Sequence, residues 1–176
     1  YYNGGIDEIV FMDAVAAYYD RNNLSEIIKR ATQDIFVPIT VGGGIRKISD
    51  IEEALNSGAD KVAINTQAIK FPEFLKEASR VFGSQAIVAS IDAKKIGLNQ
   101  WVAYIDNGRE PTNIDILNWV KAVEDLGAGE IMLTSIDKDG TKKGFDFELN
   151  NAVSKIAKVP LIVSGGAGSI SDCVTQ

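Results

Sequence analysis

The sequence contains no histidine and a single cysteine, Cys173. The absence of histidine excludes histidine-based acid/base catalysis and histidine ligands to a metal. One cysteine cannot form a disulfide framework or a cysteine metal cluster, which is consistent with a reducing compartment such as the cytoplasm. We expect no metal and no other cofactor, and carboxylates remain as the natural general acids and bases.

The chain also lacks long apolar runs and an excess of basic residues. No run approaches the roughly 18–20 residues of a membrane span, and no signal peptide is visible. The 24 acidic residues outnumber the 18 basic ones, for a net charge of −6, which argues against nucleic-acid binding. With 45% hydrophobic residues among 176, the sequence predicts a cytoplasmic globular protein that binds neither membrane nor nucleic acid.

Strand-like apolar runs alternate with amphipathic helices along the chain. The runs are hydrophobic nearly throughout, as in strands buried on both faces, and six of them alternating with helices predict a parallel sheet. Segment 99–112 breaks the pattern, and WVAYI followed by DNG predicts a small hairpin after the fourth strand. The predicted strands are 8–14, 37–43, 61–65, 86–93, 130–137 and 160–166, and the predicted helices are 23–33, 49–58, 72–83, 114–127 and 146–158.

Two segments lying 122 residues apart have similar sequences. PITVGGGIRKISD at 38–50 aligns without a gap to PLIVSGGAGSISD at 160–172, and GIDEI at 5–9 aligns to GAGEI at 127–131 with the same offset. Strand–helix alternation fits a doubly wound sheet or a (β/α)8 TIM barrel, and this direct repeat favours a barrel of two similar halves.

A complete barrel needs eight strands and ~250 residues, and the sequence predicts six strands. The chain also begins on YYNGGID rather than on methionine. We therefore expect residues 1–176 to form one partial (β/α)8 domain that is truncated at both ends and lacks the first and last strands.

Both repeated turns run from a strand through glycines into a helix. Glycine allows a ligand to approach the backbone, and the helix N-terminus offers N–H groups and a positive dipole end. At the neighbouring strand end, Asn65 and Thr66 add an amide and a hydroxyl. Two such turns at half-barrel spacing predict a substrate with a phosphate at each end, and purely structural turns are the alternative.

Asp92 is the second candidate functional feature, because it ends the otherwise apolar strand AIVASID. An ionisable group at the end of a buried strand is unfavourable unless it is paired or used in chemistry. Asp92 is therefore the candidate general acid or base, with a helix cap or a partner for Lys94 as the alternative. Asp13 and Asp137 also follow strands, and we expect them to support the site rather than carry its chemistry.

Charged residues mark the opposite end of three predicted strands. GIDE, GADK and GAGE each place a charged residue three positions after a glycine, giving Glu8, Lys61 and Glu130. Side chains that point inward there would form a cluster of mixed sign across the floor of the barrel. The alternative is that they only mark where buried strands meet solvent.

Several of these segments together resemble a known family. ITVGGGI, GADKVAINT, FGSQAIVASIDAK, GAGEIMLTSIDKDGTKKGFD and SGGAG closely resemble the cyclase subunit (HisF family) of imidazole glycerol phosphate synthase over essentially the whole chain. The resemblance implies a (β/α)8 barrel and a cytoplasmic lyase of histidine biosynthesis. It implies that ammonia from a partner glutaminase reacts with a bisphosphorylated formimino nucleotide, which yields imidazole glycerol phosphate and aminoimidazole carboxamide ribotide.

The resemblance also implies roles for individual residues. Asp92 matches one of two catalytic aspartates, and the other would lie on the absent first strand. The remaining matches fall into phosphate contacts, pocket residues and a floor ring that admits ammonia and faces the docked glutaminase. These are Gly44, Asn65 and Thr66 for one phosphate; Asp139, Gly140 and Gly166 for the other; Asp13, Thr134 and Ser164 in the pocket; and Glu8, Lys61 and Glu130 in the floor ring, the ammonia gate.

One segment departs from the family pattern. After Asp13 the chain reads AVAAYYDRNNL, and RNNL is more similar to paralogues paired with amidotransferases in bacterial surface-polysaccharide (lipopolysaccharide) synthesis. Those paralogues use glutaminase-derived ammonia on a sugar-derived substrate. The alternatives to a histidine-pathway cyclase are therefore such a paralogue and a non-catalytic barrel that binds phosphates. We do not expect the 176 residues alone to turn over substrate.

Overall fold

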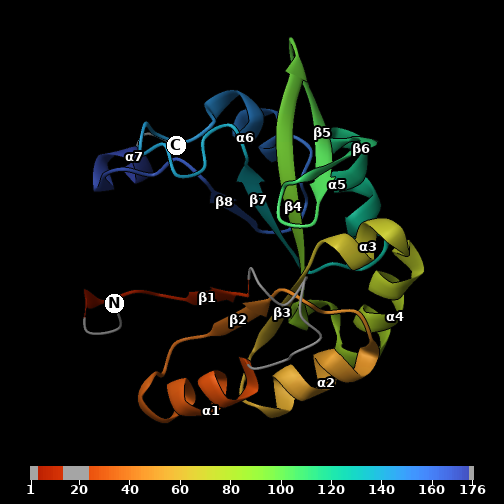
Figure 1. Ribbon diagram of the computed structural model, residues 1–176, viewed down its shortest axis with the longest axis vertical. Helices are drawn as coiled ribbons and strands as arrows, with labels where there is room; N and C mark the ends of the chain where they lie inside the picture. The colour runs from red at the N-terminus through yellow and green to blue at the C-terminus, as the bar shows by residue number, and fades with distance from the viewer. Residues whose placement is uncertain (1–3, 14–23, 175–176) are drawn as a thin grey trace.

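The computed structural model describes residues 4–13 and 24–174, so most of the segment that departs from the family pattern lies outside the described residues. Six parallel strands form a curved sheet in the order β1-β2-β3-β4-β7-β8, with helices outside it (Figure 1). The predicted α/β architecture with six parallel strands is confirmed. The strands are β1 (Ile9–Met12), β2 (Ile39–Gly42), β3 (Lys61–Ile64), β4 (Ile87–Gly97), β7 (Glu130–Ser135) and β8 (Leu161–Ser164).

The helices begin and end where local sequence signals place them. The carboxylate of Asp115 accepts the N–H of Asn118 at the start of α5, and Pro72 begins α4, which ends before Gly83 at a φ of 86°. The sequence missed α3 and the 3-10 turn η2, because elements of three to five residues are too short to show a helical period. The helix expected after the second glycine turn is found as α7. The helices are α1 (Leu24–Asp34), α2 (Ile48–Asn56), α3 (Thr66–Lys70), α4 (Pro72–Phe82), η2 (Ser84–Ala86), α5 (Ile116–Asp125), α6 (Phe147–Ser154) and α7 (Ile170–Val174).

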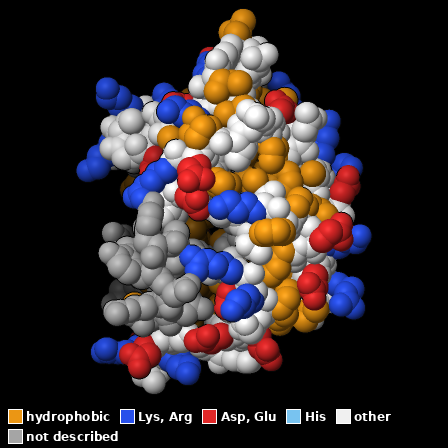
Figure 2. Space-filling view, turned by 45° about the vertical axis from the view of Figure 1, so that its right-hand side comes forward, with side chains coloured by type: hydrophobic (Ala, Val, Ile, Leu, Met, Phe, Trp, Pro, Cys, Tyr) orange, Lys and Arg blue, Asp and Glu red, His pale blue; other side chains and the backbone are white. Residues whose placement is uncertain are grey.

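An antiparallel arm extends from the end of β4 (Figure 1). The sequence predicts that the fourth strand ends at 93, but β4 continues to Gly97 because β5 (Gln100–Ile105) pairs with its second half. This pairing supplies hydrogen-bond partners to β4 beyond the last residues that pair with β7. With β6 (Glu110–Asp115), the predicted hairpin is confirmed as part of a longer arm. Ile96 and Leu98 near its tip are exposed, and Figure 2 shows hydrophobic side chains at the top of the molecule.

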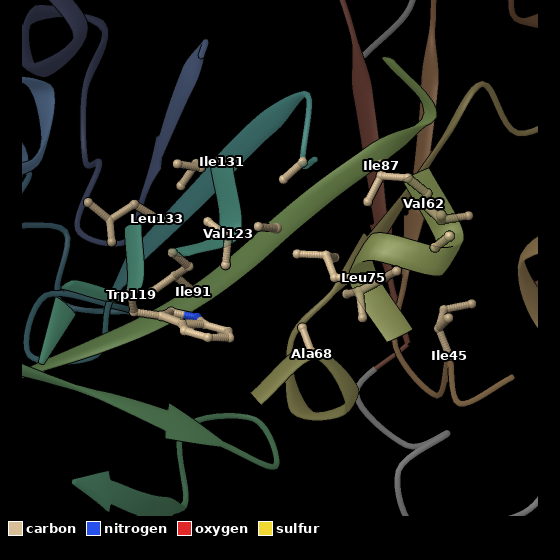
Figure 3. Close-up of a cluster of buried hydrophobic side chains, with 14 of the residues drawn as sticks. Ile45, Val62, Ala68, Leu75, Ile87, Ile91, Trp119, Val123, Ile131 and Leu133 are labelled. Atoms are coloured by element: carbon tan, nitrogen blue, oxygen red, sulfur yellow. The ribbon is translucent and has the colours of Figure 1, made fainter. Parts of the chain in front are cut away.

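Alternate residues of each strand face opposite sides of the sheet. On the outer side, Val62, Ile87 and Ile131 pack with Leu75 of α4 and Val123 of α5 in the main core (Figure 3). Removing a large side chain from such a core typically destabilises a protein by about 2–5 kcal/mol. The inner face has a separate, smaller apolar cluster, which comprises Ala63, Val88 and Met132 with Val10 and Ile162 packed against it.

The same two-residue period divides the inner face into three levels. On β3 and β7, which flank β4, the charged Lys61 and Glu130 begin the strands, and the apolar Ala63 and Met132 follow two residues later. Polar side chains then follow at the carboxyl ends, where Thr134 is one example. The strands therefore carry a charged floor, an apolar middle and a polar mouth, which positions both candidate sites.

The sequence repeat is also a repeat of hydrogen bonds. Ile9 donates its N–H to the carbonyl of Pro38 at 3.0 Å, and the equivalent pair Ile131 and Pro160 has the same distance. A Cβ on Gly43, at a φ of 97°, would lie 2.2 Å from the carbonyl oxygen of Asp13, and one on Gly165, at a φ of 90°, would lie 2.7 Å from that of Ser135. Both turns therefore require glycine for the same steric reason.

The outermost parallel strands of the described sheet each have one neighbour: β1 pairs with β2 alone and β8 pairs with β7 alone. No described helix combines the length and the apolar character that crossing a bilayer requires.

Candidate functional site

A cavity of about 880 Å³ opens at the carboxyl ends of the parallel strands. This is the end at which (β/α)8 barrels carry their chemistry. Residues from β3, β4, β7 and β8 meet there with residues from the loop after β2 and from the turn between β5 and β6, although these segments are far apart in the sequence. The predicted site residues that line the cavity are Gly44, Asn65, Thr66, Asp92, Thr134, Asp139 and Ser164.

Three predicted site residues lie near this rim but are not among the described residues that line the cavity. Asp13 is half-buried, and its N–H donates to the carbonyl of Gly42 at 2.8 Å. Gly166 is buried and its carbonyl accepts the N–H of Gly144 at 2.9 Å, whereas Gly140 is exposed. These positions shape the loops around the cavity in the ligand-free protein.

Asp92 lies in the cavity wall, where the arm leaves the sheet. Its Oδ2 accepts a hydrogen bond from Nδ2 of Asn65 at 2.9 Å. Burial raises the pKa of Asp92 to about 6, the Asn65 hydrogen bond opposes this shift, and the negative charge of Asp139 adds to it. Such a carboxyl can release and take up a proton near neutral pH.

Neither structural alternative for Asp92 is found in the described residues. Asp92 lies within β4, so it does not cap a helix. Lys94 is not paired with it in the described contacts, and its Nζ lies 5.6 Å from the ring centroid of Tyr104 instead. The sequence alternative of a cap or a Lys94 partner is therefore wrong, and Asp92 keeps no structural partner other than Asn65.

The turn of the arm returns over the cavity, which sequence reasoning missed. Asp106 accepts the hydroxyl of Thr66 at 3.3 Å and donates its own N–H to that hydroxyl at 3.0 Å. Its carboxylate also lies 3.8 Å from Nζ of Lys70. The DNG sequence predicted the turn, but not that it would lie over the end of β3. Sequence reasoning also missed the cations that line the cavity. These are Arg46, Lys70 and Arg109.

Four backbone N–H groups immediately before α2 and α7 are already occupied. Oδ2 of Asp50 accepts the N–H groups of Arg46 and Lys47 at 2.8 and 2.9 Å. The equivalent Asp172 accepts the N–H groups of Gly168 and Ser169, which lowers its pKa. These four groups are therefore not free to bind phosphate, and donation from the first turn of each helix stays a prediction.

The predicted floor residues form one ion-pair cluster. Nζ of Lys61 lies 3.1 Å from Oε2 of Glu8 and 2.7 Å from Oε1 of Glu130, and Thr40 donates its hydroxyl to Glu8 at 2.7 Å. Burial lowers the pKa of Lys61, but the hydrogen bonds with Glu130 and Glu8 outweigh it, and the net shift is upward. The second carboxylate oxygen of Glu130, Oε2, is buried without a hydrogen-bond partner among the described residues. The three side chains therefore meet inside the barrel rather than mark separate strand ends.

The described residues include no group of three or more histidine, cysteine, aspartate or glutamate side chains that could hold a metal ion. The cavity instead combines the carboxyl of Asp92, three further carboxylates, side-chain amides and the three cations named above. This set of side chains can transfer protons and bind anionic ligands.

Comparison with known proteins identifies close relatives. Residues 1–175 match the family described as "Histidine biosynthesis protein". The imidazole glycerol phosphate synthase subunit HisF of Legionella pneumophila is 52% identical over 172 residues, which is 98% of this chain and 81% of that protein. Those of Hydrogenobaculum sp. and Streptococcus mutans are 54% and 47% identical, over 92% and 99% of this chain and 64% and 69% of their own lengths. The half-barrel repeat and these matches have one explanation: the chain belongs to the histidine biosynthesis protein family, and its relatives are HisF subunits.

Proposed function

We propose that this chain is the cyclase part of an imidazole glycerol phosphate synthase, a lyase that uses ammonia. The observation that carries the proposal is Asp92, whose carboxyl has a pKa raised by burial and lines a cavity together with Gly43 and Gly44 of the first glycine turn and Ser164 beside the second. Ammonia would react there with a bisphosphorylated formimino nucleotide, giving imidazole glycerol phosphate and aminoimidazole carboxamide ribotide. The matches to HisF subunits support this reaction.

Asp92 is the proposed general acid or base. Forming and breaking the carbon–nitrogen bonds of this reaction requires protons to be delivered and removed, and a pKa of about 6 suits that exchange near neutral pH. The burial that raises this pKa also shields the reacting groups from water.

The two phosphates would lie at opposite sides of the cavity. On one side we assign Gly44, Asn65 and Thr66, and on the other Asp139, Gly140 and Gly166, with Thr134 and Ser164 along the wall between them and Asp13 near the rim. Because Asp50 and Asp172 occupy the N–H groups of the following residues, the glycines before them are the proposed backbone donors. The cations Arg46, Lys70 and Arg109 favour a ligand with several negative charges.

A glutaminase is the proposed partner, docked on the floor. Glu8, Lys61 and Glu130 would form the ammonia gate there. Beyond them the inner face is mostly apolar, with Ala63 and Met132 in its middle level, and Ser90, which pairs in register with Met132, adds a hydroxyl there. We also infer a single domain and a cytoplasmic location, where such a partner enzyme works.

The other two candidates receive less support. The relatives compared are HisF subunits, and none is a surface-polysaccharide paralogue. A non-catalytic phosphate-binding barrel would not require a carboxyl with a pKa near neutrality in its cavity.

The test is turnover by the full-length protein with added ammonium chloride and the bisphosphorylated formimino nucleotide, together with growth of a histidine auxotroph that carries the full-length gene. Turnover and growth are the expected results. Phosphate binding without turnover would favour the non-catalytic barrel, and absence of both growth and turnover would leave the paralogue as the better assignment.

A further inference from the structure

The side chain of Asn65 is oriented by Asp92 rather than by the cavity. Its Nδ2 donates to Oδ2 of Asp92 at 2.9 Å. Its Oδ1 is buried, and no described residue or backbone group donates a hydrogen bond to it. A buried carbonyl oxygen without a partner is unfavourable, so the contact with Asp92 is the interaction that holds the amide in this orientation.

This contact makes the two oxygens of Asp92 unequal. Oδ2 is held by Asn65, whereas Oδ1 has no described hydrogen-bond partner. Along the sheet, Asp92 pairs in register with Tyr104 of the arm and Thr134 of β7, so its backbone is fixed on both sides. A carboxylate with a fixed backbone and one fixed oxygen offers the other oxygen to the cavity in a defined position.

The same contact decides what Asn65 offers a ligand. A phosphate accepts hydrogen bonds, so the amide could bind it only through Nδ2. Nδ2 carries two hydrogens. One is donated to Asp92, so the side chain keeps a single N–H that a phosphate could accept, while Oδ1 cannot donate. The family resemblance implies a phosphate contact at Asn65, and in this geometry the residue can supply one through its backbone N–H or through this second side-chain N–H.

We propose that Asn65 is a positioning residue for Asp92, which fixes Oδ2 of the carboxylate and leaves Oδ1 as the atom that exchanges a proton with the substrate. The role as a proton-transfer atom rests on the proposed function, whereas the contact between the two side chains does not. Other charged groups face the same cavity and act on Asp92 at longer range: Arg46, Lys70, Asp106, Arg109, Glu110 and Asp139.

The test is a titration of Asp92 by nuclear magnetic resonance of its carboxyl carbon, assigned with Asp92→Asn. In Asn65→Leu the pKa of Asp92 should rise above about 6 by roughly one unit, because the anion loses its donor. Gln67→Met is the matched control, since Gln67 lines the same cavity with an amide that has no described contact with Asp92, and it should leave the titration unmoved. Asn65→Ser replaces Asn65→Leu if that variant does not fold.

The pH profile of turnover separates a positioning role from a phosphate contact. In Asn65→Leu the acid limb of the profile for ammonia-dependent kcat/KM should move upward with the Asp92 titration. Loss of a phosphate contact alone would weaken binding of inorganic phosphate, measured by calorimetry, without moving that limb. An unmoved Asp92 titration or an equal shift in the Gln67→Met control would each overturn the proposal. If the full-length unmodified protein shows no ammonia-dependent turnover, the proposed function fails, while the carboxyl titration still decides the role of Asn65.

Discussion

Ionisable groups lie on the inner face at both the floor and the mouth of the barrel, but the charges that surround them differ. At the floor, Lys61 lies between the carboxylates of Glu8 and Glu130, so opposite charges compensate one another. At the mouth, Asp92 has a neutral amide as its hydrogen-bond partner and the like charge of Asp139 nearby. Burial acts on both ends, but a counter-charge is available to only one of them.

The difference separates a structural cluster from a chemical one. Paired charges keep their ordinary ionisation state over the physiological range, as the raised pKa of Lys61 indicates. An unpaired buried carboxyl has its pKa moved toward neutrality, which gives it two accessible protonation states at working pH. Four predictions test this contrast, in order of decreasing effect.

The largest effect is expected at Asp92. Asp92→Asn should reduce ammonia-dependent turnover by ~10²–10⁴, because the amide cannot take part in proton transfer. Asp137→Asn is the control, since Asp137 follows the neighbouring strand but does not line the described cavity; it should change turnover less than about threefold. Equal losses in both variants would remove the special role of Asp92.

The same substitution should change how stability depends on pH. Between the usual pKa of 3.8 and about 6, the folded protein retains a proton on Asp92 that the unfolded chain has released. The free energy of unfolding should therefore fall as pH rises through this window, by roughly 3 kcal/mol. Urea unfolding from pH 4 to 7 should show that Asp92→Asn gains stability relative to the unmodified protein as pH rises. A difference that does not change with pH would mean that Asp92 is not held at a raised pKa.

At the floor, removing a charged side chain should destabilise the protein rather than stabilise it, because loss of the cation leaves two carboxylates facing each other. Lys61→Ala should lower the free energy of unfolding by about 1–3 kcal/mol. It should also impair glutamine-driven turnover more than turnover with added ammonia. Lys76→Ala, at an exposed ion pair with Glu73, should do neither. Equal losses with both nitrogen sources would contradict the proposed ammonia gate.

The smallest effect concerns Asp106, an additional anion at the mouth. Its carboxylate contacts Thr66 and Lys70, which are groups that could otherwise act on a phosphate. Asp106→Asn should tighten binding of inorganic phosphate by about fivefold, which is close to 1 kcal/mol of removed repulsion. Calorimetry measures this directly, and weaker binding by the variant would mean that Asp106 organises the subsite rather than competes for it.

The sequence predicted elements and rim positions well because those signals are local. Apolar runs located all six parallel strands, and their ends placed Gly44 and Asp92 at one rim, where both line the cavity. The sequence did not show that Asp50 and Asp172 would occupy N–H groups just before the two helices. Whether a carboxylate caps its own helix depends on side-chain rotamers that a strand-and-turn pattern does not encode.

By itself, the sequence determined the alternation of strands and helices, the duplicated half-barrel and the residue types at each strand end. These follow from two-residue and helical periods and from glycines that no other residue replaces. The tertiary structure alone decided that Asn65 contacts Asp92, and that the turn of the arm covers the cavity beside Thr66. Such contacts join residues 27 and 40 positions apart, so they depend on strand register and sheet curvature, which local patterns do not specify.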